Sequence, residues 1–219
     1  MSDLTTWIVA HGIPADTLIY LLYVPIIATI INISRYVIGF KTYGIYAPLT
    51  LSFAFYYAGI RFGLLLTVGV ILATLLAYRV LSKIRMHYVS RISVTYIFII
   101  IFVIFLITAN EVSPISITTS NHNPNAIHPL AIIVIATLSD YFIKKYVRRS
   151  MYTAALSMFE TIIVALIGWS FIKYQPMHDF LFTNAWIIFL LIPLNIWLGQ
   201  YSGLRLREYL RFRHIAKHT

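Results

Sequence analysis

Glu160 is the residue whose chemistry fits its surroundings least, because it is a carboxylate inside an apolar run, Met158-Phe-Glu160-Thr-Ile-Ile-Val-Ala. A helix on this run places Glu160 about nine residues in, or roughly 14 Å along the axis. A charge at that depth in a membrane is costly, so the side chain should face other helices and carry a partner or a proton. Two interpretations stay open: a site for a proton or a cationic group, and an interhelical hydrogen bond to a Ser, Thr or Tyr.

A second set of groups lies where apolar runs meet charged residues. Arg35, Lys41 and Thr42 surround the entrance to a short apolar run, where they could hold a carboxylate or a phosphate, Arg by a bidentate hydrogen bond. Snorkelling of the basic side chains to lipid headgroups is the alternative. Asp140 lies near the end of another run and precedes Lys144 by four residues, which predicts an ordinary ion pair along a helix.

Seven apolar runs are the elements that must position these residues. The chain of 219 residues is 60% hydrophobic and 11% charged, whereas soluble domains average about 25% charged residues. Only helices or closed barrels satisfy every backbone group in hydrocarbon, and runs this long are helical. We therefore predict an all-α integral membrane protein whose seven transmembrane helices cover residues 17–38, 45–60, 62–81, 92–109, 127–142, 154–172 and 180–200.

The 17 Lys and Arg residues predict the orientation of these helices. They gather in alternate connections and in the tail, with Arg61 and Lys173 as the exceptions. The positive-inside rule then places the N-terminus outside and the C-terminus in the cytoplasm. Residues 1–16 would be a short outer N-terminus, 17–203 the membrane domain and 204–219 a basic cytoplasmic tail. The net charge of +10 does not indicate a nucleic-acid partner, because no basic domain offers a binding face.

Two short runs open on a similar phrase and predict an internal repeat. The phrases are Gly44-Ile-Tyr-Ala-Pro48-Leu-Thr-Leu and Asn125-Ala-Ile-His-Pro129-Leu-Ala-Ile. An inverted 3+3 repeat plus one helix would account for them, and paired proline-led short helices in inverted halves point to a membrane binding site. The alternative is that Pro48 and Pro129 only begin short helices packed inside the bundle. Small residues spaced by four favour close helix contacts in the third and sixth runs: Gly69, Ala73 and Ala77, and Ser157, Thr161 and Ala165.

The tail has the pattern of a basic helix that continues from the last run. Four of its residues are candidates for docking a cytoplasmic partner, namely Arg205, Glu208, Arg211 and Arg213. An anchor that lies on the lipid surface is the alternative interpretation of the same residues.

Enzyme and metal motifs are scarce in this sequence. The absence of Cys excludes disulfides, thiolate zinc sites and Cys nucleophiles, and no signature of zinc peptidases, P-loop proteins or serine hydrolases occurs. His122 and His128 flank Asn123-Pro-Asn125 without a nearby carboxylate, which makes a weak metal site. We expect no catalytic residue, no metal and no cofactor. An intramembrane transferase or hydrolase that uses Glu160 or His128 is the alternative.

Several stretches resemble a known membrane family. Arg35-Tyr-Val-Ile-Gly39-Phe-Lys41-Thr42-Tyr-Gly44-Ile-Tyr-Ala-Pro48-Leu-Thr-Leu-Ser-Phe-Ala-Phe resembles the signature of the seven-helix membrane domain usually fused to an inactive transglutaminase-like domain. Asp140-Tyr-Phe, Phe159-Glu160-Thr and Gly199-Gln-Tyr-Ser-Gly203-Leu-Arg205-Leu-Arg-Glu208-Tyr-Leu-Arg211-Phe-Arg213 look like later motifs, so the resemblance covers about residues 18–213. It implies that Lys41, Thr42, Gly44 and Pro48 are motif positions, without assigning a role to them.

The resemblance also implies partners. Only 16 residues precede the first run, so we expect the transglutaminase-like domain to be a separate outer chain or to be dispensable. The short proline-containing helices look, more distantly, like those of the membrane subunit of poly-γ-glutamate synthesis and export. Members of the fused family are often encoded beside an ATP-grasp amino-acid ligase, which implies a ligase on the cytoplasmic side.

Together these features predict a non-catalytic subunit of a prokaryotic inner membrane. It would be a conduit or docking platform for an anionic peptide or amino-acid polymer made by a cytoplasmic ATP-grasp-type ligase. A purely structural membrane anchor for the transglutaminase-like partner is the alternative. Membrane lipid is an expected partner in either case, and a homo-oligomer stays open.

Overall fold

The computed structural model describes Trp7 and residues 10–12, 14–112 and 129–200. These residues form helices joined by short turns, with no strand among them. They fall into two compact units: unit 1 is drawn from Met1–Leu49 and Glu160–Thr219, and unit 2 from Thr50–Phe159. The boundaries lie inside two helices, so unit 1 combines two segments that are distant in sequence, whereas unit 2 is one continuous segment.

Four helices of the described ranges are long and apolar enough to cross a membrane. They cover Thr17–Ile38, Ile60–Leu81, Val89–Ala109 and Met151–Lys173, and a bent pair of helices near the C-terminus makes a fifth span if it is counted as one. The all-helical, apolar character predicted from the sequence is therefore confirmed.

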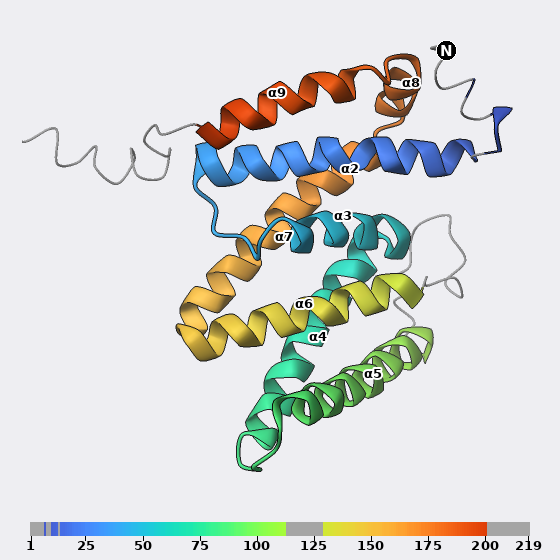
Figure 1. Ribbon diagram of the computed structural model, residues 1–219. Coiled ribbons are helices and arrows are strands. Elements are labelled where there is room, and N and C mark those ends of the chain that lie inside the picture. Colours follow the sequence, from blue (N-terminus) through green and yellow to red (C-terminus); the bar gives the residue numbers. More distant parts are fainter. Residues whose placement is uncertain (1–6, 8–9, 13, 113–128, 201–219) are drawn as a thin grey trace, which may run out of the picture. The chain divides into compact units, whose positions relative to one another are not determined.

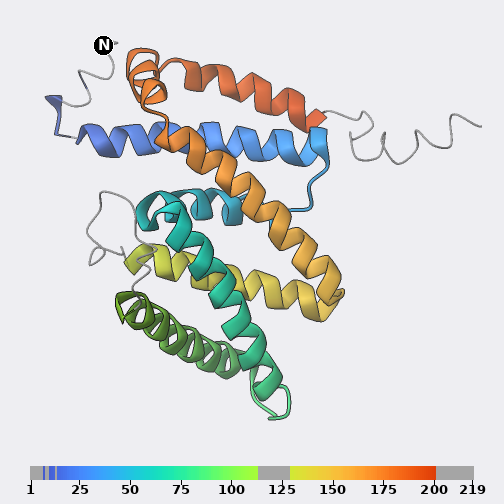
Figure 2. The ribbon, with the colours of Figure 1, turned by 180° about the vertical axis from the view of Figure 1, so that it is seen from behind.

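Unit 1 is built on the first apolar run. Helix α2 (Ala15–Ile33) continues into a π-helical turn, η1 (Ser34–Ile38), and α9 (Ile187–Gln200) packs along α2. The short helix α8 (Gln175–Thr183) also contacts α2. In both ribbon views α2 and α9 run in the same direction, and α7 (Met151–Lys173) runs in the opposite one (Figures 1 and 2).

A polar network that the sequence did not suggest joins α2 to α9. The amide of Asn195 donates a hydrogen bond to Thr29 Oγ1 at 2.7 Å, and the amide of Asn32 donates to Asn195 Oδ1, also at 2.7 Å. Thr29 in turn donates to the carbonyl of Pro25. Such bonds across apolar helices give an apolar interface a fixed register.

The last predicted helix, over residues 180–200, is corrected by the structure into two helices. The chain bends by 101° between α8 and α9. Asn184 follows α8, and both its backbone N–H and its side-chain amide donate to the carbonyl of Phe180. An Asn that caps its own helix in this way competes with continuation of the helical ladder, which is the physical reason for the break.

Unit 2 is organised around the long helix α4 (Ile60–Leu81), which packs against α5 (Tyr88–Val112) and α6 (Pro129–Arg148). The part of α3 (Tyr46–Ala58) from Thr50 onward and the first residues of α7 complete the unit. Gly59, with φ of 77°, separates α3 from α4, and its carbonyl accepts the N–H of Gly63 at 2.8 Å. A left-handed φ of this kind is accessible to Gly at little cost.

Small residues on α4 bring α5 close, as their spacing predicts. A Cβ added to Gly69 would lie 2.7 Å from Phe102 Cε1 and 2.8 Å from Leu106 Cδ1 of α5. Ala73 and Ala77, on the same side of α4, are also buried. The absence of larger side chains therefore permits this contact.

The expected pairing of two short helices is only half correct. Helix α3 has 13 residues, whereas α6 has 20, because Lys144, Lys145 and Arg148 continue the helix past its apolar part. Basic residues near a helix C-terminus interact favourably with its dipole and extend such ends. The two compact units also differ from the two consecutive three-helix segments of the expected repeat, so the inverted repeat stays a prediction.

Candidate functional site

Glu160 of α7 lies in unit 1 and is held by the backbone of a turn distant in sequence. Its Oε2 accepts a hydrogen bond from the backbone N–H of Lys41 at 2.5 Å, and only 4% of the residue is exposed. The sequence left open a site for a proton or a cationic group and an interhelical hydrogen bond to a Ser, Thr or Tyr; this donor is a main-chain amide in the segment that leads into α3. The carboxylate therefore accepts a backbone N–H of the turn that leads into α3, where no helix or sheet pairs that group.

Thr161, the next residue of α7, holds the same segment. Its Oγ1 accepts the N–H of Tyr43 at 3.1 Å, and Thr161 itself is fully buried. Glu160 and Thr161 thus receive the N–H groups of two alternate residues, Lys41 and Tyr43. We call these two residues of α7 and residues 39–45 the polar clamp.

The turn within the polar clamp depends on glycine. Gly39 and Gly44 have φ of 94° and 70°, and Gly39 ends the π-helical turn by donating its N–H to the carbonyl of Ser34 at 3.0 Å. Between them the hydroxyl of Thr42 donates to the carbonyl of Gly44 at 3.0 Å. A residue with a Cβ at either glycine position would strain the backbone, so the sequence Gly39-Phe-Lys41-Thr42-Tyr-Gly44 encodes the turn locally.

The side chains of the polar clamp differ in exposure. Thr42 and Tyr43 are buried, and burial raises the pKa of the Tyr43 hydroxyl above its usual value. Lys41 and, on η1, Arg35 are exposed. The clamp therefore uses the backbone of Lys41 inside the unit and leaves its ammonium group at the surface, where Arg35 also lies.

The predicted site residues are divided between the two units. Arg35, Lys41, Thr42, Gly44, Pro48 and Glu160 belong to unit 1, and Pro129 and Asp140 to unit 2. Pro48 is buried in the first turn of α3, and Pro129 is the first residue of α6, both positions at which a missing N–H costs little. The predicted ion pair is confirmed: Asp140 Oδ2 lies 2.7 Å from Lys144 Nζ.

One end of unit 2 is strongly basic. The C-terminal ends of α4 and α6 and the start of α5 lie together there, as the ring contact of Tyr78 with Tyr146 at 5.6 Å and the two ribbon views show (Figures 1 and 2). We call this surface the basic end; its residues are Arg79, Lys83, Arg85, Arg91, Lys144, Lys145 and Arg148. Two connections that the sequence assigned to the same membrane face therefore do lie at the same end of the unit.

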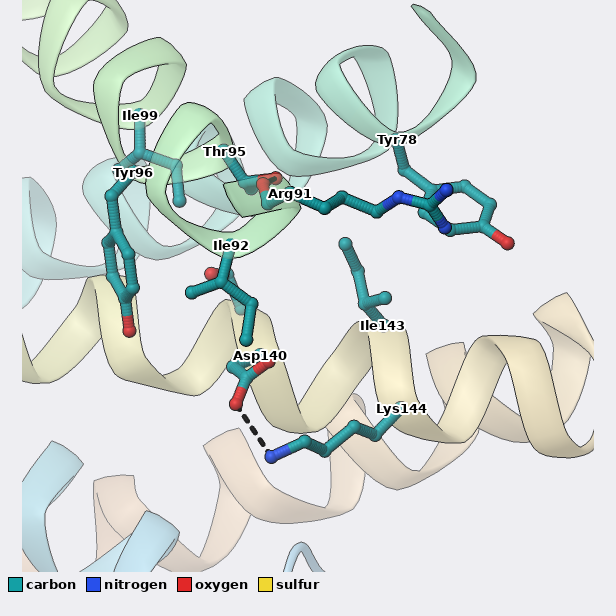
Figure 3. A pocket seen from close by; sticks show the side chains of 10 residues that line it. Tyr78, Arg91, Ile92, Thr95, Tyr96, Ile99, Asp140, Ile143 and Lys144 are labelled. Carbon is teal, nitrogen blue, oxygen red and sulfur yellow. Dashed lines mark hydrogen bonds and ion pairs between the residues drawn. The ribbon is translucent and has the colours of Figure 1, made fainter. Parts of the chain in front are cut away.

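A cavity opens at the basic end between α4, α5 and α6. It is lined by Tyr78, Arg91, Ile92, Thr95, Tyr96, Ile99, Ser139, Asp140, Ile143 and Lys144. Figure 3 shows Asp140 turned toward Lys144, while Arg91 extends from α5 toward Tyr78 of α4. Sequence reasoning did not single out Arg91; its position directly before the apolar run 92–109 is the signal that could have found it.

Candidate metal ligands do not cluster in the described ranges. Within them, no group of three His, Asp or Glu side chains could hold a metal ion. His122 and His128, named for the weak metal site, lie outside the described residues, as do the tail residues Arg205, Glu208, Arg211 and Arg213. The arrangement that the structure does describe can clamp a backbone turn and present positive charge.

The fold and these sites define an all-helical integral membrane protein. Over residues 13–216 the chain matches the family described as seven transmembrane helices usually fused to an inactive transglutaminase, and it belongs to that family. No curated protein and no solved structure gives a significant match to the chain. The resemblance seen in the sequence is thereby confirmed, and the chain is a membrane domain of a family associated with a transglutaminase-like domain.

Proposed function

We propose that this chain is a non-catalytic membrane subunit whose basic end is a docking platform for an anionic peptide or amino-acid polymer. The observation that carries the proposal is the charge balance of that end. Lysines and arginines come together there from three helices, and the carboxylate of Asp140 is already paired with Lys144. A surface with this excess of positive charge attracts polyanions and speeds their association.

The orientation of the chain supports a cytoplasmic source for the polymer. Connections rich in Lys and Arg lie on the cytoplasmic side of membrane proteins, so the basic end faces the compartment in which an ATP-grasp-type ligase would make an anionic product. The N-terminus then lies outside an inner membrane. A separate transglutaminase-like chain on that side would replace the domain to which the family is usually fused.

The polar clamp supports docking over proton-coupled transport. The carboxylate of Glu160 is buried and accepts a main-chain N–H, so its first task is to hold the turn before α3. A protein that only docks a polymer needs no titrating carboxylate in its interior. A conduit that carries the polymer across the membrane is the stronger form of the proposal, and it requires a measurement of flux as well as of binding.

Binding of a labelled glutamate oligomer to the protein in nanodiscs tests the docking platform. The variant Arg79→Gln/Lys83→Gln/Arg85→Gln should bind about tenfold more weakly at low salt, since exposed charge pairs contribute up to about 1 kcal/mol each. Binding by the unchanged protein should also fall as salt is added.

Arg61→Gln is the matched control, because Arg61 and Arg79 lie on the same helix, roughly 27 Å apart along its axis at 1.5 Å per residue. Arg61→Gln should change the affinity less than twofold, whereas Arg79→Gln alone should weaken it measurably. Equal effects of the two substitutions, or binding insensitive to salt, would refute docking at the basic end.

Flux of the same oligomer into liposomes tests the conduit. If the oligomer binds but no flux is measured, the docking platform is supported and the conduit is refuted. In a third outcome, neither the unchanged protein nor the triple variant binds the oligomer, but a transglutaminase-like chain co-purifies equally with both. That outcome would favour the structural anchor. The hydrogen bonds that the polar clamp makes to the chain's own backbone are the observation that supports this second candidate.

A further inference from the structure

The cavity of unit 2 contains a charged group that its own protein surroundings do not satisfy. The Nε of Arg91 is buried and has no hydrogen-bond partner, and its guanidinium makes no hydrogen bond or ion pair with any residue that the structure describes. Arg is always charged and carries five N–H donors. Leaving a buried donor of a charged group without an acceptor costs more than for a neutral one.

None of the other polar groups that line the cavity accepts a hydrogen bond from the Nε of Arg91. Asp140 is paired with Lys144 and points to it, away from Arg91 (Figure 3). The hydroxyl of Thr95 donates to the carbonyl of Arg91, and that of Ser139 to the carbonyl of Ala136, so both are engaged with their own helices. Within the ranges that the structure describes, no residue accepts from this guanidinium, which leaves it open to an acceptor supplied by a bound ligand.

The volume and the lining of the cavity indicate which class of ligand could supply that acceptor. It has a volume of about 50 Å³ and is lined largely by apolar surface, with Ile92, Ile99 and Ile143 among its residues. A free anion gains nothing from isoleucine side chains, whereas a molecule with an anionic head and a hydrocarbon chain contacts both kinds of surface. Arg91 also lies at the end of the span Val89–Ala109, the depth at which lipid headgroups sit.

We propose that this cavity is a binding site for an anionic membrane phospholipid, with the lipid phosphate on the guanidinium of Arg91 and hydrocarbon against Ile92 and Ile143. The bidentate geometry of guanidinium and phosphate makes Arg the suitable residue. The site shares Arg91 and Lys144 with the basic end, but the polymer would approach the exposed residues of that end, such as Arg79 and Lys83, whereas the lipid would enter the apolar cavity.

Thermal unfolding of the delipidated protein in detergent tests the site with three additions: phosphatidylglycerol, phosphatidylcholine with the same acyl chains, and sodium phosphate. Phosphatidylglycerol should raise the Tm by about 3–5 °C at roughly ten times its Kd. Phosphatidylcholine and sodium phosphate should give less than a third of that shift. An equal shift with phosphatidylcholine, or with sodium phosphate, would overturn the assignment of an anionic lipid.

Variants separate the cavity from its charged surroundings. Arg91→Gln should lose the shift with phosphatidylglycerol, whereas Arg148→Gln, which removes an exposed charge of the same end outside the cavity lining, should keep it. Ile143→Phe narrows the cavity without changing its charge and should also reduce the shift, which keeps the test decisive if Arg91→Gln fails to fold. A full shift in Arg91→Gln or in Ile143→Phe would overturn the proposal.

The same assay distinguishes this site from the docking platform. The triple variant Arg79→Gln/Lys83→Gln/Arg85→Gln leaves the cavity lining intact, so it should keep the lipid shift even if it no longer binds the glutamate oligomer. Loss of the lipid shift in this variant would show that the lipid responds to the general charge of the basic end, which would refute the site at Arg91.

Discussion

The polar clamp of unit 1 and the cavity of unit 2 each place a charged residue beside an apolar run, and the two charges have opposite surroundings. Glu160 accepts a main-chain N–H and is almost fully buried. Arg91 has a buried donor that no described residue accepts. The contrast shows that a charge near a membrane span is no guide to function until its partners are known.

The two units also hold their helices together by different means. Unit 1 relies on polar contacts, from Glu160 and Thr161 to the turn before α3 and from Asn195 to Thr29. Unit 2 adds close packing of α4 against α5 at Gly69 to a polar contact, in which Lys145 Nζ of α6 donates to Ser157 Oγ of α7. Glu160 and Thr161 of the polar clamp are thus engaged in structure, whereas Arg91 of unit 2 keeps a buried donor without an acceptor.

Removing the carboxylate of the polar clamp should have the largest effect. Glu160→Ala removes the carboxylate that accepts the N–H of Lys41 and should lower the free energy of unfolding by about 1.5–3 kcal/mol, the range for hydrogen bonds to charged groups. Glu160→Gln keeps an acceptor and should lose less. Thermal unfolding in detergent measures both; a full loss of oligomer binding in a stable Glu160→Gln would instead assign Glu160 a functional role.

Enlarging Gly69 should have the next largest effect, because the added atoms meet Phe102 and Leu106 of α5. Gly69→Val should cost about 2 kcal/mol, as overpacking of a close contact does. Gly199→Val is the control, since nothing lies within 4 Å of a Cβ at Gly199. If the two substitutions destabilise the protein equally in thermal unfolding, close packing does not hold α4 against α5.

Removing the second acceptor of the polar clamp should cost less than removing the first. Thr161→Val keeps the shape of the side chain and loses the oxygen that accepts the N–H of Tyr43. The expected loss is about 1 kcal/mol, as for a neutral hydrogen bond, and Thr161→Ser should restore most of it. Unfolding that is unchanged in Thr161→Val would mean that Glu160 alone secures the turn.

Breaking the ion pair at the cavity should have the smallest effect on stability. The side chains of Asp140 and Lys144 are 26% and 46% exposed, and pairs of this kind contribute less than about 0.5 kcal/mol. Asp140→Asn also removes the carboxylate that lines the cavity, so it should strengthen the shift given by phosphatidylglycerol. A weakened lipid shift with unchanged stability would show that the pair organises the site.

The apolar runs predicted the helices because a segment in hydrocarbon must satisfy the hydrogen bonds of its own backbone, and a helix does so within itself. The predicted run 62–81 became α4 almost unchanged, and the spacing of Asp140 and Lys144 was enough to predict their contact, since helical neighbours are four residues apart. The glycines of the turn before α3 likewise encode their conformation locally. The longest motif of the family resemblance, residues 35–55, includes this turn.

The partners of Glu160 and Arg91 were decided only by the tertiary structure. Hydropathy marks Glu160 as unusual, but its acceptor role depends on a turn more than a hundred residues earlier in the chain. The bend between α8 and α9 was hidden as well, because Asn184 interrupts a run whose composition alone permits one helix. Local sequence thus determined which segments are helical, whereas the identity of each polar group's partner is a property of helix packing that no single segment contains.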